Sequence, residues 1–293
     1  GLSGIMSRIA YVNGRYVAHG EAQIHIEDRG YQFADGIYEV AAIFRGQIID
    51  EDGHLERMKR SLGELRMDMP MPEEPFRLVC RETLRRNRVR DGIIYIQVSR
   101  GVSPRDHPFP KDVKPALVMT ARAVAWPENA DDDKGAEVAT VADIRWLRRD
   151  VKSISLLPNI LAKQEAREKS AYEAWFVDGD GFVTEGSSTN AWIVDDQGRI
   201  VTRQLDNNIL GGITRATVLK LARENSIEII ERAFTVEEAL AAPEAFLTST
   251  TSFIKGIVGI DGAEVGDGKP GPVTRRLRAL YLDYCRGSGS NLA

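Results

Sequence analysis

The sequence lacks the features that mark secreted, membrane-spanning and metal-binding proteins. It has only two cysteines among 293 residues, Cys80 and Cys285, and they match no CxxC spacing. We therefore predict reduced thiols and no metal site. No apolar run approaches the length of about 20 residues that a membrane span requires, and the N-terminus has no signal-peptide core. These absences predict a cytoplasmic protein without a membrane partner.

An excess of charge of one sign is also missing. Lysine and arginine number 39 and aspartate and glutamate 43, so the net charge is −4. A protein that binds nucleic acid usually carries a basic surface, which this balance does not provide. The chain has no internal repeat and no low-complexity tract, and its 43% hydrophobic content is enough to fill a core. We expect a globular protein of one large or two ordinary domains with small-molecule partners.

The first part of the chain has the pattern of a β-sheet with helices. Asn13-Gly14 is a strong hairpin signal, and a second strand pair turns near Arg45-Gly46. Apolar residues recur at helical spacing in residues 52–67. Further elements are expected as a helix at 75–87, strands at 91–101 and 114–124, and a proline-rich loop at 103–110. A loop of that length is often functional.

A polar and acidic stretch with a proline, AWPENADDDKG, is the best candidate for a domain boundary. We predict an N-terminal domain at 6–125, a linker at 126–135 and a C-terminal domain at 136–286. The leading GLSGI is expected to be an added segment, and the final RGSGSNLA a frayed tail. After the boundary, strands are expected at 136–148, 151–155, 173–179, 182–194, 227–233 and 244–260, and helices at 157–171, 214–226 and 235–243.

Three places could hold a phosphate group. A Gly-Gly pair at 211–212 precedes Ile213 and Thr214, which open a helix whose unpaired N–H groups favour an anion. An ordinary loop with Thr214 as the N-cap is an equal alternative. Hydroxyl residues at 248–252 follow an apolar strand and offer several donors. Arg57 lies beside the apolar stripe of its helix, and periodicity alone indicates a surface arginine.

Two lysines have different surroundings. Lys152 lies in the run DVKSIS, which is expected to be a strand, and a lysine facing inward there needs a partner or a covalent role. An edge-strand lysine that points to water is the alternative. Lys163 lies among charged residues of a helix and is expected to be solvated and inert.

Two acids stand in apolar surroundings. In VTEGSSTNAWIV, Glu185 is followed by glycine and three hydroxyl residues before the chain returns to apolar residues. A buried acid beside several hydroxyls would imply a polar ligand, whereas an exposed turn would imply nothing. Glu39 alternates with Ile37 and Ala41, so it shares their buried face and needs a cation. Tyr38 lies on the opposite face.

Arg105 and His107 stand two apart in the proline-rich loop. A guanidinium and an imidazole so placed could both bind a carboxylate, although most such loop charges are only solvated. Taken together, an interior lysine, an acid near hydroxyls, a helix N-terminus after Gly-Gly and an arginine able to bind phosphate describe a site for pyridoxal 5′-phosphate.

From about Tyr11 to Tyr281 the sequence resembles the fold type IV pyridoxal-phosphate enzymes, and among them the D-amino acid aminotransferases. The resemblance rests on motifs that follow in order along the chain: EDRGYQFADGIYEV, HLERM, RGVSPRDHPFP, DIRWLRRDVKS, LLPNILAKQEA, VTEGSSTN, ILGGITR and TSTTS. It implies an α+β fold with a smaller N-terminal α/β domain and a larger C-terminal pseudo-barrel domain. It also implies a homodimer with shared active sites.

The resemblance further implies a role for each site residue. Lys152 resembles the catalytic lysine that binds the cofactor covalently, and Glu185 resembles the partner of the pyridine nitrogen. The residues that resemble the family's phosphate-binding group are Arg57, Ile213, Thr214, Thr250 and Thr251. Leu210 would pack near the cofactor ring. The residues that resemble the family's trap for the α-carboxylate of a D-amino acid are Tyr38, Arg105 and His107. D-Alanine, D-glutamate and D-aspartate are the substrates expected of the family, with 2-oxo acids as acceptors in a ping-pong cycle.

Several alternatives remain open at this stage. An L-branched-chain aminotransferase, an R-selective amine aminotransferase or a lyase acting on aminodeoxychorismate would keep the cofactor and change the substrate. Arg105 with His107 favours the D-specific enzyme, because a simple amine needs no carboxylate trap. A protein that carries pyridoxal phosphate without catalysis, or a phosphate-binding domain, would share part of the site. Lys255, which follows the 248–252 hydroxyls, is a rival amine to Lys152.

Overall fold

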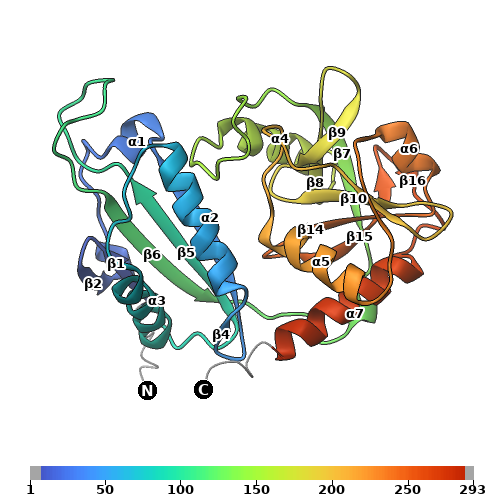
Figure 1. The fold of residues 1–293 in the computed structure, drawn as a ribbon, viewed down its shortest axis with the longest axis horizontal. Coiled ribbons are helices and arrows are strands. Elements are labelled where there is room, and N and C mark those ends of the chain that lie inside the picture. Colours follow the sequence, from blue (N-terminus) through green and yellow to red (C-terminus); the bar gives the residue numbers. More distant parts are fainter. Residues whose placement is uncertain (1–7, 288–293) are drawn as a thin grey trace. The chain divides into compact units, whose positions relative to one another are not determined.

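The structure is a computed structural model that describes residues 8–287, so GLSGI and the last six residues of the expected tail lie outside it. The described chain divides into two compact units (Figure 1). The first unit contains the residues up to Trp126 together with Val151–Ser155, and the second contains Pro127–Asp150 and the chain from Leu156 onward. Lys152 therefore belongs to the first unit. The domain limits expected from the sequence stay a prediction.

An antiparallel six-stranded sheet forms the centre of the first unit, in the order β2-β1-β6-β5-β3-β4. Its strands are β1 (Ile9–Val12), β2 (Arg15–Ala18), β3 (Gly36–Phe44), β4 (Gln47–Ile48), β5 (Gly92–Ser99) and β6 (Ala116–Ala123). Its helices are η1 (His19–Glu21), α1 (Arg29–Phe33), α2 (Glu51–Glu64) and α3 (Glu73–Arg86). Helices α2 and α3 pack on one face of the sheet (Figure 1) and bury an apolar core that includes Met58, Leu62 and Phe76.

Both predicted hairpin turns are present in the first unit. Asn13 and Gly14 join β1 to β2 with positive φ angles of 48° and 92°, and Arg45 and Gly46 join β3 to β4 with 49° and 81°. Asparagine and glycine adopt this left-handed region at low cost, which is why the first turn could be predicted from the sequence. The predicted helices and strands of this unit are also confirmed, with small shifts at their ends.

A ten-stranded mixed sheet forms the second unit, in the order β12-β11-β10-β14-β15-β7-β8-β9-β13, with β16 paired to β15. Its strands are β7 (Ala136–Ala142), β8 (Glu173–Val177), β9 (Phe182–Gly186), β10 (Asn190–Val194), β11 (Ile200–Thr202), β12 (Ile229–Glu231), β13 (Phe234–Thr235), β14 (Glu244–Ser249), β15 (Phe253–Ile260) and β16 (Ala263–Glu264). Its helices are η2 (Ala130–Asp132), α4 (Leu157–Glu168), α5 (Ile213–Glu224), α6 (Val236–Ala241) and α7 (Pro272–Gly287).

This second sheet curls on itself. Strands β9 and β10 are far apart in the pairing order, yet they lie against each other because a three-residue turn joins them. The strands from β10 through β14, β15, β7 and β8 to β9 thus surround a core that includes Trp175, Phe234 and Leu247. Such a closed arrangement is the expected pseudo-barrel, and the α+β class is confirmed.

Several expected elements of the second unit were wrong in extent. The single strands predicted at 182–194 and 244–260 are each broken by a turn into two separate strands. The strand predicted at 136–148 ends at Ala142, and residues 151–155 make only an isolated bridge, from Ser153 to Ile37. Helix α7 was not predicted, although it buries Leu277, Tyr281 and Leu282 on one face against β15. Hydroxyl residues, which favour turns, stand at both strand breaks, and Gly186 precedes the first.

Two further expectations concern the chain as a whole. Cys80 and Cys285 are both buried thiols, as predicted. Within residues 8–287, no helix is long and apolar enough to cross a membrane.

Candidate active site

Lys152 is held against the start of β3 in the first unit. Its carbonyl oxygen accepts from Tyr38 N at 3.1 Å, and Ile154 N donates to Gly36 O at 3.1 Å. The side chain is half-buried, and Nζ lies 4.1 Å from the centre of the Tyr38 ring. A cation over an aromatic face is stabilised by the ring quadrupole. The segment is not the expected strand, but the amine points to Tyr38 rather than away from the protein.

Tyr38 belongs to a small aromatic cluster on the same face of β3 and β5. Its ring centre lies 6.0 Å from that of Tyr95, whose hydroxyl donates to Gln97 Oε1 at 2.6 Å. Burial, with a smaller contribution from Tyr38, raises the pKa of Tyr95 to about 12. Tyr95 therefore stays protonated and acts as a hydrogen-bond donor at neutral pH.

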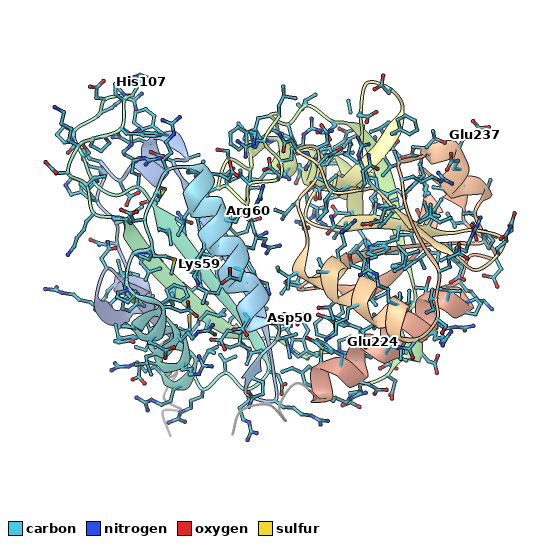
Figure 2. All side chains as sticks on the ribbon, in the orientation of Figure 1. Asp50, Lys59, Arg60, His107, Glu224 and Glu237 are labelled. Carbon is cyan, nitrogen blue, oxygen red and sulfur yellow. The ribbon has the colours of Figure 1, made fainter. Side chains whose placement is uncertain are left out.

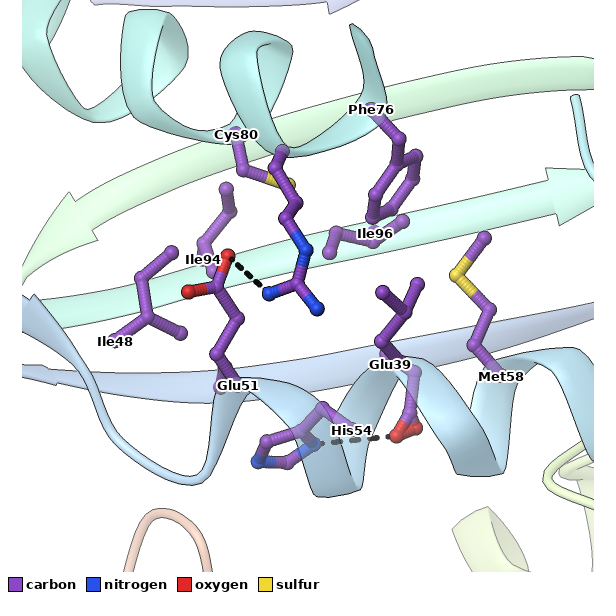
Figure 3. Close-up of a pocket in the computed structure, with 12 residues that line it drawn as sticks. Glu39, Ile48, Glu51, His54, Met58, Phe76, Cys80, Ile94 and Ile96 are labelled. Atoms are coloured by element: carbon purple, nitrogen blue, oxygen red, sulfur yellow. Dashed lines mark hydrogen bonds and ion pairs between the residues drawn. The ribbon is translucent and has the colours of Figure 1, made fainter. Parts of the chain in front are cut away.

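Glu39 is the buried acid that the alternation of β3 predicted, and it has the cations that it needs. Arg57 Nε donates to both carboxylate oxygens at 2.8 and 3.0 Å, and Arg57 Nη2 donates at 2.6 Å. His54 Nδ1, one turn earlier on α2, lies 3.2 Å from Glu39 Oε1 (Figure 3). Although burial by itself raises the pKa of Glu39, Arg57 and His54 lower it to about 2. Arg57 is thus oriented by a bidentate ion pair and is not the surface arginine that periodicity alone indicated.

Replacing Glu39 should destabilise the first unit in a pH-dependent way. A pKa lowered from 4.5 to about 2 corresponds to about 3 kcal/mol of stability, present above pH 4.5 and lost as the pH falls towards 2. Glu39→Gln should therefore lower the free energy of unfolding by about 3 kcal/mol at pH 7, and the deficit should shrink between pH 4.5 and 2. Urea unfolding across this range measures it.

A matched control is Glu82→Gln. Glu82 also has a pKa lowered to about 2, by Arg85 first and then Arg86, but it is a surface residue of α3. Solvent screens such pairs, so this variant should unfold almost like the parent. An equal loss in both variants would contradict the role given to burial at Glu39.

Next to the Glu39 group lies a small cavity between α2, α3 and the sheet (Figure 3). Its lining is mostly apolar and includes Leu55, Phe76, Cys80 and Ile94. Burial raises the pKa of the Cys80 thiol to about 12, so this thiol is not a nucleophile at neutral pH.

Arg105 and His107 lie on the exposed loop between β5 and β6, where Figure 2 labels His107. The guanidinium of Arg105 stands 4.4 Å from the centre of the Phe33 ring, and the His107 ring centre lies 5.3 Å from the same ring. The two side chains therefore share one aromatic neighbour on α1. The two side chains are therefore not simply solvated loop charges, because both contact the ring of Phe33.

Glu185 lies near the end of β9 in the second unit and is surrounded by donors. Arg145 Nη1 donates to Oε1 at 2.6 Å, and Asn190 Nδ2 donates to Oε2 at 3.1 Å. Leu210 N lies 3.2 Å from both oxygens, and Leu210 O accepts from Asn190. Of the two alternatives for Glu185, a buried acid or an exposed turn residue, the structure has the buried acid. Its partners are Arg145, Asn190 and a backbone amide.

Arg145 was missed by the sequence analysis, which placed it in a strand. Asp143 holds it from the other side, accepting from Arg145 Nε at 3.0 Å and from Nη2 at 2.8 Å. Thr184 Oγ1 donates to Asp143 at 2.7 Å, and Arg149 lies 3.2 Å from Asp143 Oδ2. The sequence did contain a signal for this ion pair. Asp143 and Arg145 stand two residues apart directly after β7, and such close opposite charges suggest a local ion pair.

The protonation of Glu185 is set by competing effects. Burial raises its pKa to about 7, against the lowering influence of Arg145 and of the Leu210 amide, and the negative Asp143 adds to the rise. The carboxyl group is therefore poised to gain or lose its proton near neutral pH. A positive charge brought next to it would favour the ionised form.

The hydroxyl residues after Glu185 have a partner that the sequence analysis did not foresee. They do not surround Glu185 but bind Glu173, a completely buried carboxylate on β8. Ser187 Oγ and Thr189 Oγ1 donate to it, the latter at 3.0 Å, and Ser188 N donates at 3.2 Å. Lys163 Nζ lies 3.5 Å from the same carboxylate, although the Lys163 side chain is exposed as expected.

Helix α5 begins at Ile213 with Gly212 as its N-cap, not Thr214. Within residues 8–287 no side chain caps this end, so its first N–H groups keep their affinity for an anion. A Cβ at Gly212 would lie 2.1 Å from Asn190 Oδ1, so only glycine allows the helix to start beside the residue that binds Glu185.

The other predicted residues of the second unit lie in the turn between β14 and β15. Thr250 is half-buried and Thr251 is exposed. Lys255, the rival amine, lies on β15, and its Nζ is 3.6 Å from Asp133 Oδ1.

The described residues thus form an α+β protein with a half-buried amine in one unit, and a buried acid and a helix end without a side-chain cap in the other. The chain belongs to the amino-transferase class IV family, whose model matches residues 36–260. It is 41% identical to the D-alanine aminotransferase of Staphylococcus haemolyticus over 96% of this chain and 99% of the relative. It is 40% identical to that of Bacillus licheniformis, covering 91% and 93% of the two chains.

A solved structure supports the same fold. The branched-chain amino acid aminotransferase of T.th., determined with pyridoxamine 5′-phosphate, is similar with a TM-score of 0.88 and 26% identity. The similarity covers 96% of this chain and 95% of that one. The fold type IV architecture expected from the sequence is therefore confirmed.

Proposed function

We propose that this protein is an aminotransferase that moves the amino group of D-amino acids, of the D-alanine and D-glutamate type, to 2-oxo acids with pyridoxal 5′-phosphate as cofactor. The observation that carries the proposal is the identity of about 40% to two D-alanine aminotransferases over nearly the whole length of each chain. The likeness to a branched-chain enzyme is lower in identity and extends mainly to the fold.

The residues present fit this cofactor. A phosphate is a dianion, and the uncapped N-terminus of α5 with the hydroxyls of Thr250 and Thr251 offers donors for it. An aldehyde needs an amine, which Lys152 supplies, and a pyridine nitrogen needs an acid, which Glu185 supplies. We assign Arg57, oriented by Glu39, to the phosphate as well, and Leu210 to the cofactor ring.

Each of these residues then has a defined task. Pyridoxal 5′-phosphate, when bound, supplies an electron-withdrawing ring that stabilises the negative charge developing at the substrate Cα. Lys152 Nζ would hold the cofactor through its aldehyde carbon, and the same amine would take the proton from the substrate Cα. Glu185 holds a proton on the ring nitrogen by its negative charge, an effect typically worth about 1 to 3 pKa units.

Substrate recognition is assigned to Tyr38, Arg105 and His107. Arg105 can bind a carboxylate through two parallel N–H bonds, and His107 can add a third donor. Both side chains contact the Phe33 ring, which restricts their positions relative to each other. This arrangement supports an amino acid rather than a simple amine as the donor substrate.

We also propose a cytoplasmic homodimer. Both units expose large apolar side chains that water solvates poorly, among them Ile26, Tyr31, Leu147 and Leu157 at 75, 72, 75 and 66% exposure. Apolar groups that are exposed in one protomer can be covered by a second copy in a symmetric dimer. The two buried thiols and the absence of a disulfide motif are in keeping with a reducing compartment.

A substrate screen tests the proposal. The purified protein, supplied with pyridoxal 5′-phosphate, should convert D-alanine and 2-oxoglutarate to pyruvate and glutamate, measured by coupled oxidation of NADH. D-Amino acids should shift the absorbance of the bound cofactor without an acceptor, as a ping-pong cycle requires. Rapid turnover of L-leucine with none of D-alanine would indicate the branched-chain activity instead. A yellow protein whose spectrum no amino acid changes would be a cofactor carrier.

A further inference from the structure

A buried arginine on α1 binds the backbone of the Arg105 loop. The side chain of Arg29 is only 5% exposed. Its Nη1 donates to Asp106 O at 2.5 Å and its Nη2 to His107 O at 3.0 Å, residues 77 and 78 positions further along the chain. A guanidinium is a rigid planar fork, so two bonds to consecutive carbonyl groups restrict both the position and the direction of the loop.

Arg29 is itself fixed by an ion network. Its Nε donates to Asp35 Oδ2 at 2.8 Å, and Arg100 binds the same carboxylate at 2.7 and 3.0 Å. Although burial alone raises the pKa of Asp35, Arg100 and Arg29 lower it, so the carboxylate keeps its charge at neutral pH. Arg100 also donates to Leu65 O at 2.8 Å, which anchors the network to the end of α2.

Side chains of the loop also contact this network and the neighbouring ring of Phe33. Phe33 lies under two guanidinium groups, that of Arg29 at 4.8 Å and that of Arg105 at 4.4 Å, and contacts the His107 ring. Arg100 stands 3.6 Å above the ring of Phe109, at the far side of the loop. The loop is therefore held through its backbone by Arg29 and through its side chains by the Phe33 ring and by Arg100.

We propose that Arg29, together with Phe33, is a positioning residue for substrate recognition: it holds the loop so that Arg105 and His107 are already ordered before the substrate carboxylate binds. The inference rests on the function proposed above for Arg105 and His107. Ordering a loop of this kind during binding costs conformational entropy, and a loop ordered beforehand avoids that cost. The effect should fall on KM and not on kcat, because the carboxylate is bound alike in the ground and transition states.

The test compares the holoenzyme with Arg29→Met, which keeps the length of the side chain and leaves Asp35 paired with Arg100. Amide hydrogen exchange in residues 103–110 should become about tenfold faster or more, because exchange reports local opening. KM for D-alanine should rise about tenfold with kcat changed less than about twofold. Phe33→Leu keeps an apolar side chain of similar bulk but removes the aromatic ring, and it should likewise speed amide exchange in the loop and raise KM. This variant tests the proposal if Arg29→Met does not fold.

Two comparisons separate the possible results. Arg278→Met removes another buried arginine, which donates to Ile254 O in the second unit, and should leave loop exchange and KM as in the parent. Arg105→Ala tests the proposed function directly. If Arg105→Ala raises KM while Arg29→Met changes neither exchange nor KM, the inference is overturned and the proposed function stands. Unchanged KM in Arg105→Ala would overturn the carboxylate role of the loop, and the inference with it.

Discussion

Lys152→Ala should abolish transamination, with a loss of turnover on the order of 10³-fold or more, because the amine is assigned both the covalent bond to the cofactor and the transfer of the Cα proton. The variant should still fold. Its segment is held to β3 by backbone hydrogen bonds of residues 152 and 154, which the substitution does not remove. The visible absorbance of the bound cofactor should shift to that of the unbound aldehyde, and borohydride should no longer attach the cofactor to the protein.

Lys255→Ala is the matched control. Lys255 is the rival amine of the second unit, and its ion pair with Asp133 is structural. This variant should keep the absorbance, the borohydride labelling and most of the turnover. The assignment of the catalytic lysine would be wrong if labelling persisted in Lys152→Ala and disappeared in Lys255→Ala. Peptide mapping of the labelled parent identifies the modified lysine independently.

Glu185→Gln should lower turnover by about 10²-fold or more, since the ring nitrogen would lose the negative charge assigned to keep it protonated. Cofactor binding should survive, because the phosphate donors at the start of α5 are unchanged. Arg145 also keeps a charge partner in the variant, Asp143, at 2.8 Å. Steady-state kinetics and a cofactor titration together distinguish lost chemistry from lost binding.

The same variant has a signature in the cofactor-free protein. The pKa of Glu185 is raised from 4.5 to about 7, chiefly by burial, so its contribution to stability is present below pH 4.5 and is lost as the pH rises through 7. Glutamine does not titrate. The free energy of unfolding of Glu185→Gln should therefore improve relative to the parent as the pH is raised from 4.5 to above 7.

Glu244→Gln is a suitable control for the kinetic measurements on Glu185→Gln. Glu244 is another buried carboxylate of the second unit and accepts from Val273 N and Thr274 N at the start of α7. Its replacement should lower stability while leaving kcat near that of the parent. Equal losses of kcat in the two variants would contradict the role proposed for Glu185.

Much of the first unit could be predicted because its signals are local. Asn13-Gly14 predicts a turn from two adjacent residues, and the alternation of β3 places Glu39 on the buried face without reference to any other segment. The need of a buried acid for a cation is equally general, and Arg57 and His54 meet it. The sequence could not say which cation, because that depends on how α2 lies on the sheet.

The second unit shows where such reasoning fails. The hydroxyls at 187–189 were taken as neighbours of a ligand near Glu185, yet they bind Glu173, which is 14 to 16 positions earlier. Polar residues at 184–190 separate two apolar segments in this stretch, but they do not show which buried group the hydroxyls bind. The chain turns between β9 and β10 where the sheet curls, and this turn lies next to Glu173 on β8.

The amino-acid sequence by itself determined the periodic elements, the two hairpin turns, the burial of Glu39 and, through its motifs, the family resemblance. Only the tertiary structure decided which groups meet: Arg145 with Glu185, Glu173 with the hydroxyl turn, and Arg29 with the Asp106–His107 backbone. The physical reason is one of range. Propensity and periodicity act over a few residues, whereas the partner of a buried charge is chosen by packing between segments that lie tens of residues apart.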